Sequence, residues 1–116
     1  MNKEELVRKS FRLSLTGPDA IKIDIDGGLF DVVDIGVKGI GIRVPRSDTF
    51  ALGEKLSSIK LTLEKVPFDI EGVVVHISGD SSDLFLCGIL LELNPLAEKK
   101  FAEYVSRYRK KIFLSR

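Results

Sequence analysis

Two arginines near the start of the chain have a spacing that suits an anionic ligand. Arg8 and Arg12 are four residues apart in the segment Arg8-Lys9-Ser10-Phe11-Arg12. A guanidinium carries a planar fork of donors that can bind phosphate oxygens in pairs and can stack on a flat base. Two such groups on one short segment could therefore close over a ligand that is both phosphorylated and aromatic.

A glycine-rich connection further along the chain offers complementary chemistry. It reads Asp34-Ile35-Gly36-Val37-Lys38-Gly39 and joins two expected strands. A carboxylate only accepts hydrogen bonds, so Asp34 suits the N1–H and N2–H donors of a guanine edge. Gly36 and Gly39 would let the backbone approach a ligand closely and adopt positive φ. Together the two segments indicate a phosphorylated, guanine-containing ligand, although surface arginines beside a tight turn are an alternative that these residues leave open.

The rest of the chain offers little for catalysis. His76 is the one histidine, and no second His or Cys stands at a metal-ligand spacing from it. A period of two places it on a strand face with Gly72, Val74 and Ser78. Cys87 is the one cysteine, so no disulfide within the chain is possible, and we expect it to act as a small buried hydrophobe. We therefore expect neither an enzyme nor a metal site.

Glycine-rich phosphate loops are also excluded. The run 36–41 contains three glycines and one lysine, which gives it a superficial likeness to such a loop. It matches neither GxxxxGK(S/T) nor GxGxxG, and no helical pattern follows it. The fold of a nucleotide-hydrolysing or dinucleotide-binding enzyme is therefore not expected.

Apolar residues that alternate with a period of two predict the strands that would position the candidate site residues. Their expected residue numbers are 11–16, 21–26, 29–34, 40–44, 55–64, 68–78 and 84–93. Short turns join several of them, with a two-residue hairpin turn at Gly27-Gly28 and a turn at Lys65-Val66-Pro67. Strands joined by such short turns must be antiparallel.

The period changes after Asn94-Pro95. Asn94 is a good N-cap, and Pro95 suits the first helical turn. Apolar residues then recur near helical spacing as far as Tyr108, so we expect a helix over 95–113. Six or seven antiparallel strands followed by one helix favour an all-β fold closed into a barrel, because open sheet edges invite aggregation. The helix would cap an open face or end of this barrel.

Length and composition agree with a single domain. The 116 residues are 44% hydrophobic and 30% charged, which allows both a core and a wet surface. No run approaches the roughly 18 apolar residues of a membrane span, and the charged N-terminus lacks the apolar segment of a signal peptide. We expect a cytoplasmic protein with one domain over 1–116. It would comprise a flexible switch segment over 1–10, a barrel over 11–93 and the helix.

The order of these features resembles the PilZ family. That family pairs an N-terminal RxxxR motif with a downstream (D/N)xSxxG motif, on a six-stranded antiparallel barrel that ends in a helix. The first motif matches at Arg8 and Arg12, and the second matches at Asp34 and Gly39. The resemblance covers nearly the whole chain, from Arg8 to about Tyr108.

The resemblance implies a receptor for the bacterial second messenger cyclic di-GMP, with no cofactor. Arg8 and Arg12 would hold the phosphates and guanine faces, Asp34 would read a guanine edge, and Gly39 would shape the turn. Gly36 stands where the family has serine. A neutral hydrogen bond contributes about 0.5–1.5 kcal/mol, so we expect binding weakened roughly tenfold or less. Binding would order the first ten residues and signal to a protein partner, for example in motility, pilus or biofilm machinery.

Two other functions remain open. One is a PilZ-like adaptor that has lost the nucleotide and binds only protein, for which Gly36 is the relevant departure. The other is a small barrel that binds RNA or single-stranded DNA through its last 22 residues, which carry a net charge of +5 against −4 for the preceding 94. Such surfaces interleave aromatic and basic residues. Here the helix aromatics Phe101, Tyr104 and Tyr108 are expected on its buried face, so nucleic acid is not an expected partner.

Overall fold

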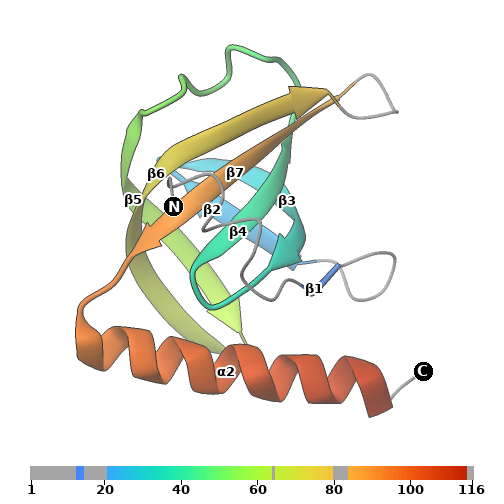
Figure 1. Cartoon of the computed structure of the whole chain (residues 1–116), viewed down its shortest axis with the longest axis vertical. Helices are drawn as coiled ribbons and strands as arrows, with labels where there is room; N and C mark the ends of the chain where they lie inside the picture. Colours follow the sequence, from blue (N-terminus) through green and yellow to red (C-terminus); the bar gives the residue numbers. More distant parts are fainter. Residues whose placement is uncertain (1–12, 15–20, 64, 80–83, 115–116) are drawn as a thin grey trace.

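The structure, a computed structural model, describes residues 13–14, 21–63, 65–79 and 84–114. It contains antiparallel strands followed by a C-terminal helix (Figure 1). The strands are β1 (Leu13–Ser14), β2 (Ile21–Ile25), β3 (Gly28–Ile35), β4 (Gly39–Val44), β5 (Lys55–Leu63), β6 (Val66–Gly79) and β7 (Phe85–Glu92), and the helix is α2 (Pro95–Leu114). The predicted class, all-β with one terminal helix, is confirmed.

Strand pairing closes the sheet into a barrel. The order β3-β2-β5-β6-β7-β4 returns to its start because β4 also pairs with β3. All of these pairings are antiparallel. The short strand β1 is outside this ring and pairs with β3, on the edge that β2 also uses. The predicted closed barrel is therefore confirmed, with six strands in the ring.

The barrel interior is filled by aliphatic side chains at alternate strand positions. In β5 the residues Leu56, Ile59, Leu61 and Leu63 are each 1% exposed or less, whereas the residues next to them are partly or fully exposed. Ile59, Leu61 and Leu63 alternate as in a regular strand. Leu56 lies three residues before Ile59 and is buried as well, because the register with β6 shifts between these two residues. Burial of one such side chain contributes about 1.5–3 kcal/mol, so this interior is the main source of stability for the scaffold.

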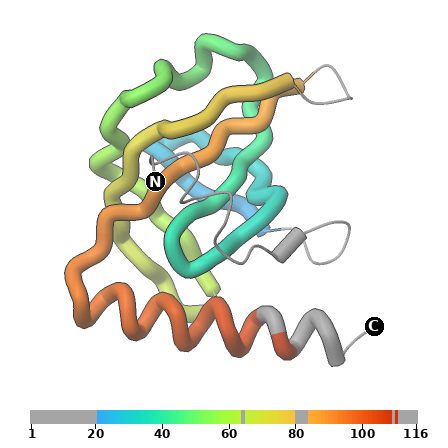
Figure 2. Tube along the Cα trace, in the orientation of Figure 1, coloured from blue at the N-terminus to red at the C-terminus, as the bar shows by residue number. Residues whose placement is uncertain are grey.

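Helix α2 closes one end of the barrel. Its first turn is capped by Asn94, whose side-chain oxygen accepts a hydrogen bond from the Ala97 N–H at 2.8 Å. Phe101 and Val105 are buried, and the Phe101 ring meets the Phe68 ring of β6 edge-on at 5.4 Å. Figure 2 shows the helix running across the lower end of the barrel. The apolar stripe predicted for this helix therefore forms part of the core.

The β2–β3 turn lies one residue earlier than predicted. Ile25 pairs with Gly28, so the two turn residues are Asp26 and Gly27, and the prediction of Gly27-Gly28 is wrong. Both turn residues have positive φ, 51° and 88°, as a type I′ hairpin turn requires. The Asp24 carboxylate accepts a hydrogen bond from the Gly27 N–H at 2.8 Å, which holds the chain in this turn.

The β5–β6 turn is shorter than predicted. Leu63 pairs with Val66 and Thr62 pairs with Pro67, so Val66 and Pro67 belong to β6. The predicted turn over 65–67 is therefore wrong in two of its three positions. Lys65 has a φ of 66°, a left-handed conformation that lets the chain reverse quickly between the two strands.

Candidate ligand-binding site

A bulge in β3 directs Asp34 to the outside of the barrel. Val32 and Ile35 are both buried, at 1% and 0% exposure, although an odd separation would normally put them on opposite faces. The register with β4 shifts between Val32 and Asp34, which accounts for the extra residue. Bulges re-aim side chains in this way and are frequent beside functional sites.

The Asp34 side chain lies over the neighbouring strand. Asp34 pairs with Gly41 of β4. A Cβ atom built on Gly41 would lie 2.7 and 2.8 Å from the two Asp34 carboxylate oxygens. The carboxylate therefore occupies the space that any side chain at position 41 would need.

The pairing continues beyond Gly41 as a row across the outer face. Gly41 pairs with Gly88 of β7, and Gly88 pairs with His76 of β6. Two glycines thus separate an acidic side chain from an imidazole across four adjacent strands. The Gly88 backbone is close to His76, because a Cβ on Gly88 would lie 3.2 Å from the His76 Cβ.

A second bulge determines where His76 points. The β6–β7 register shifts between Val74 and His76. Gly72 and Val74 therefore face the core and are buried, whereas His76 and Ser78 are partly exposed on the outer face. The prediction of a half-exposed strand histidine is confirmed, but its predicted shared face with Gly72 and Val74 is wrong, because the bulge inverts the alternation.

The turn between β3 and β4 is closed by its own backbone. The Gly36 N–H donates to the Gly39 carbonyl oxygen at 2.9 Å. Both glycines are buried. The glycines with positive φ among the described residues are Gly27 and Gly53, so the expectation of positive φ at Gly36 and Gly39 is wrong.

The same turn is tied to two distant elements through Lys38. Its carbonyl oxygen accepts a hydrogen bond from the Leu91 N–H of β7 at 2.9 Å. Its ammonium group lies 2.6 Å from a carboxylate oxygen of Glu98, in the first turn of α2. The turn that carries the second motif is thus fixed to both the barrel wall and the helix.

The two predicted arginines, Arg8 and Arg12, lie outside the described residues. The chain that follows Arg12 is described, as β1. Leu13 pairs with Ile35, and Ser14 pairs with Asp34. The structure therefore gathers three predicted site residues, Asp34, Gly36 and Gly39, at the β3–β4 connection, and β1 runs beside them.

Sequence reasoning missed several residues around this connection. Gly41 and Gly88 form the middle of the row, and the partly buried Arg43 lies two residues beyond Gly41 on the outer face of β4. One available signal was the alternation of glycines at positions 39 and 41, since glycine inside a strand often marks close approach of another group. The pairing partners themselves depend on bulges, which the sequence pattern does not reveal.

Other reactive groups offer no competing chemistry in the described part of the chain. Burial raises the pKa of the Cys87 thiol to about 12, and the nearby negative charge of Glu54 adds to the effect. The thiol therefore stays protonated and inert, as expected. Among the described residues no group of three His, Cys, Asp or Glu side chains could hold a metal ion. No described helix is both long and apolar enough to cross a membrane.

Comparison with known families identifies the fold. The sequence profile described as PilZ domain matches residues 6–107. The chain belongs to the PilZ domain family. A search of curated protein sequences gives no match to this PilZ domain.

Solved structures agree with this assignment. The PilZ domain of YcgR from Escherichia coli, solved with c-di-GMP, has a TM-score of 0.71 at 15% identity, covering 93% of this chain and 96% of that one. MotI/DgrA, an inhibitor of motility from Bacillus subtilis, has a TM-score of 0.70 at 19% identity, covering 90% and 52%. The K. pneumonia MrkH–c-di-GMP complex has a TM-score of 0.67 at 18% identity, covering 84% and 50%. This PilZ domain thus spans about half the length of the MotI and MrkH chains.

Proposed function

We propose that this PilZ domain is a receptor for cyclic di-GMP that signals to a protein partner and catalyses no reaction. The observation that carries the proposal is the β1–β3 pairing, which sets the residues after Arg12 against Asp34 and Ile35. The DxGxxG connection therefore lies beside the strand that directly follows the RxxxR segment in the sequence, which supports a site built from both motifs. Two of the similar structures, YcgR and MrkH, contain c-di-GMP.

The chemistry of the gathered residues suits this dinucleotide. The Arg8 and Arg12 guanidinium groups would donate charge-assisted hydrogen bonds to the phosphates and stack on the guanine faces. The Asp34 carboxylate would accept hydrogen bonds from the N1–H and N2–H groups of one guanine. The turn closed by Gly36 and Gly39 holds Asp34 at the end of β3 and brings backbone close to the ligand.

Signalling would follow from the attachment of the arginine segment. Binding draws Arg8 and Arg12 onto the barrel beside β1, which changes the surface that a partner meets. The ion pair between Lys38 and Glu98 would transmit the change on binding to α2, because Lys38 belongs to the turn beside Asp34 and Glu98 belongs to the helix. A partner in motility or biofilm machinery fits the named function of MotI as an inhibitor of motility.

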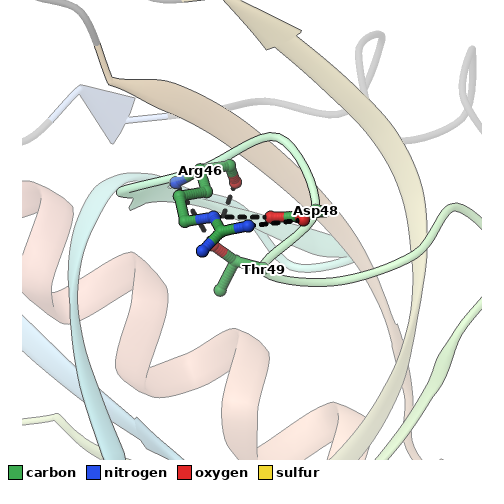
Figure 3. Close-up of polar contacts among 3 residues, drawn as sticks. All are labelled: Arg46, Asp48 and Thr49. Carbon is green, nitrogen blue, oxygen red and sulfur yellow. Dashed lines mark hydrogen bonds and ion pairs between the residues drawn. The ribbon is translucent and has the colours of Figure 1, made fainter.

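Calorimetric titration with cyclic di-GMP tests the proposal, with Arg8→Ala and Arg12→Ala as the test variants. Arg46→Ala is the matched control, because it removes one arginine charge from a loop where the guanidinium binds only local partners. Arg46 donates to the Asp48 carboxylate at 2.9 and 2.8 Å (Figure 3). We expect saturable binding that either test variant abolishes and the control leaves intact. Absence of binding by the unmodified chain would contradict the receptor proposal.

A second candidate function is a protein-binding adaptor without nucleotide, and the glycine at position 36 favours it. The replacement of the family serine removes one hydroxyl from the site. The variant Gly36→Ser separates the two functions. In a receptor it raises affinity for cyclic di-GMP by up to about tenfold, since one neutral hydrogen bond is restored. In an adaptor that has lost the site it restores no measurable binding.

Nucleic-acid binding through the helix has little support from the described side chains. Phe101 is fully buried, and Tyr104 and Tyr108 pack partly against the core. The Arg107 guanidinium lies over the Tyr104 ring, 5.1 Å from its centre. The aromatic faces that would stack on bases are therefore already engaged.

A further inference from the structure

We propose that Gly41 is a positioning residue that determines guanine specificity by leaving room for the Asp34 carboxylate. The inference rests on the proposed function, because it assigns a role within the cyclic di-GMP site. Gly41 is outside both sequence motifs, and it follows Gly39 by two residues on the same face of β4. Its role depends on the neighbouring strand rather than on its own backbone conformation.

The Asp34 carboxylate lies above the backbone of Gly41. Both carboxylate oxygens lie within 2.8 Å of the place where a Cβ at position 41 would stand, and the carboxylate carbon lies 3.0 Å from it. Real Cβ atoms do not approach oxygen so closely. An alanine at position 41 therefore has to displace the carboxylate or shift the strand.

Displacement of the carboxylate is the smaller of these two changes. Gly41 pairs with Asp34 of β3, next to the bulge, and with Gly88 of β7 on the other edge of β4. A shift of β4 would break backbone pairing on both edges, whereas rotation of the Asp34 side chain leaves the backbone pairing of β4 intact. Gly41 also lacks positive φ, so alanine at this position carries no backbone strain of its own. The barrel therefore tolerates alanine, and the carboxylate moves.

Displacement of the carboxylate would change the hydrogen bonds that Asp34 makes to the edge of the guanine base. A carboxylate that accepts from both N1–H and N2–H of guanine must lie in the plane of the base at hydrogen-bonding distance from both donors. A rotated Asp34 loses at least one of these bonds. Loss of either bond weakens binding, and loss of the bond to N2–H also reduces the preference for guanine over hypoxanthine, which keeps N1–H but lacks the exocyclic amino group.

The test compares Gly41→Ala with the unmodified chain in titrations with cyclic di-GMP and with its hypoxanthine analogue cyclic di-IMP. We expect Gly41→Ala to lower affinity for cyclic di-GMP about tenfold or more, and to bring the affinity ratio of the two ligands toward one. Gly79→Ala is the control, because a Cβ there meets nothing within 4 Å and its φ is not positive. A purely structural defect would weaken both ligands equally and leave the ratio unchanged.

A double-mutant cycle keeps the inference testable if Gly41→Ala folds poorly. In the Asp34→Ala background the carboxylate is absent, so adding Gly41→Ala should change neither the unfolding midpoint nor the affinity. Equal effects of Gly41→Ala in both backgrounds would overturn the inference. So would an unchanged ligand ratio in a chain that binds cyclic di-GMP. Failure of the unmodified chain to bind cyclic di-GMP would instead overturn the proposed function, and this inference with it.

Discussion

Strand β4 is preceded by the turn 36–38 and followed by the loop 45–54, and the turn differs from the first half of this loop in the contacts that hold it. The second half of the loop is bonded to β6, because the Gly53 N–H donates to the Val74 carbonyl oxygen at 2.7 Å. The turn depends on distant partners: its Lys38 bonds to Leu91 of β7 and to Glu98 of α2. The first half of the loop depends on near neighbours, through the bonds that join Arg46 to Asp48 and Thr49 (Figure 3).

This difference favours the turn over the first half of the loop as the place for the proposed ligand site. Distant contacts fix the turn relative to the whole barrel. Asp34, which lies beside the turn, therefore keeps a defined position from which it could bind the proposed ligand. The bonds within the first half of the loop fix its shape, but they do not place Arg46 or Asp48 against another element. The bidentate pair of Arg46 and Asp48 also satisfies two charges that a ligand would otherwise use.

The largest expected contrast is between the aspartates of the two connections. Asp34→Ala removes a charge-assisted contact worth about 1.5–3 kcal/mol, so affinity for cyclic di-GMP should fall at least about tenfold. Asp48→Ala should leave the affinity unchanged, because Asp48 is exposed and bonded to Arg46. Calorimetric titration of both variants measures the contrast, and similar losses would show that the loop takes part in binding.

A smaller effect is expected on stability at Gly53, in the second half of the loop. Gly53 has a φ of 85° with open space around it, so Gly53→Ala introduces backbone strain and no clash. The free energy of unfolding should fall by about 1 kcal/mol. Urea unfolding measures the change, with Gly79→Ala as a control expected to stay within about 0.5 kcal/mol. A neutral Gly53→Ala would mean that the loop relaxes around the substitution.

The smallest expected effects concern the ion pairs of the two connections. Lys38 and Glu98 are 44% and 41% exposed, whereas Arg46 and Asp48 are 74% and 67% exposed. Exposed pairs contribute about 0–1 kcal/mol, and screening by salt weakens them. Lys38→Ala should therefore destabilise the domain by about 0.5–1 kcal/mol, and Arg46→Ala by less. Urea unfolding at low and high salt measures the destabilisation caused by each variant. A larger destabilisation by Arg46→Ala than by Lys38→Ala would contradict the prediction.

Local patterns in the sequence predicted much of the fold. Alternating apolar residues located the strands of the barrel, and the pair Asn94-Pro95 located the start of α2, where the Asn94 cap is observed. The error at Gly28 concerns the position of a two-residue turn and the error at Val66 concerns the length of a turn, and both depend on where pairing stops. A turn residue can also serve as the last paired residue of a strand, so sequence alone leaves this boundary open.

The candidate site was only partly predictable for a different reason. The sequence could predict Asp34, Gly36 and Gly39 as site candidates, because all three belong to one local motif. Gly41 was missed because its closeness to the Asp34 carboxylate depends on a bulge in β3 and on the register between two strands. The face of His76 was missed because a second bulge reverses the alternation. Insertion of one residue into a ladder inverts every later position, and no period in the sequence marks it.

The barrel closes without β1, so the strand next to the proposed arginine segment is not part of the ring. Six strands complete the ring of hydrogen bonds, whereas β1 adds two paired residues along one edge of β3. Release of β1 would therefore leave the ring and its core intact. In hydrogen-exchange terms, the β1 amides should exchange through a local opening, and the central barrel amides only through global unfolding. The proposed docking of the arginine segment would therefore leave the hydrogen bonds of the six-stranded ring unchanged.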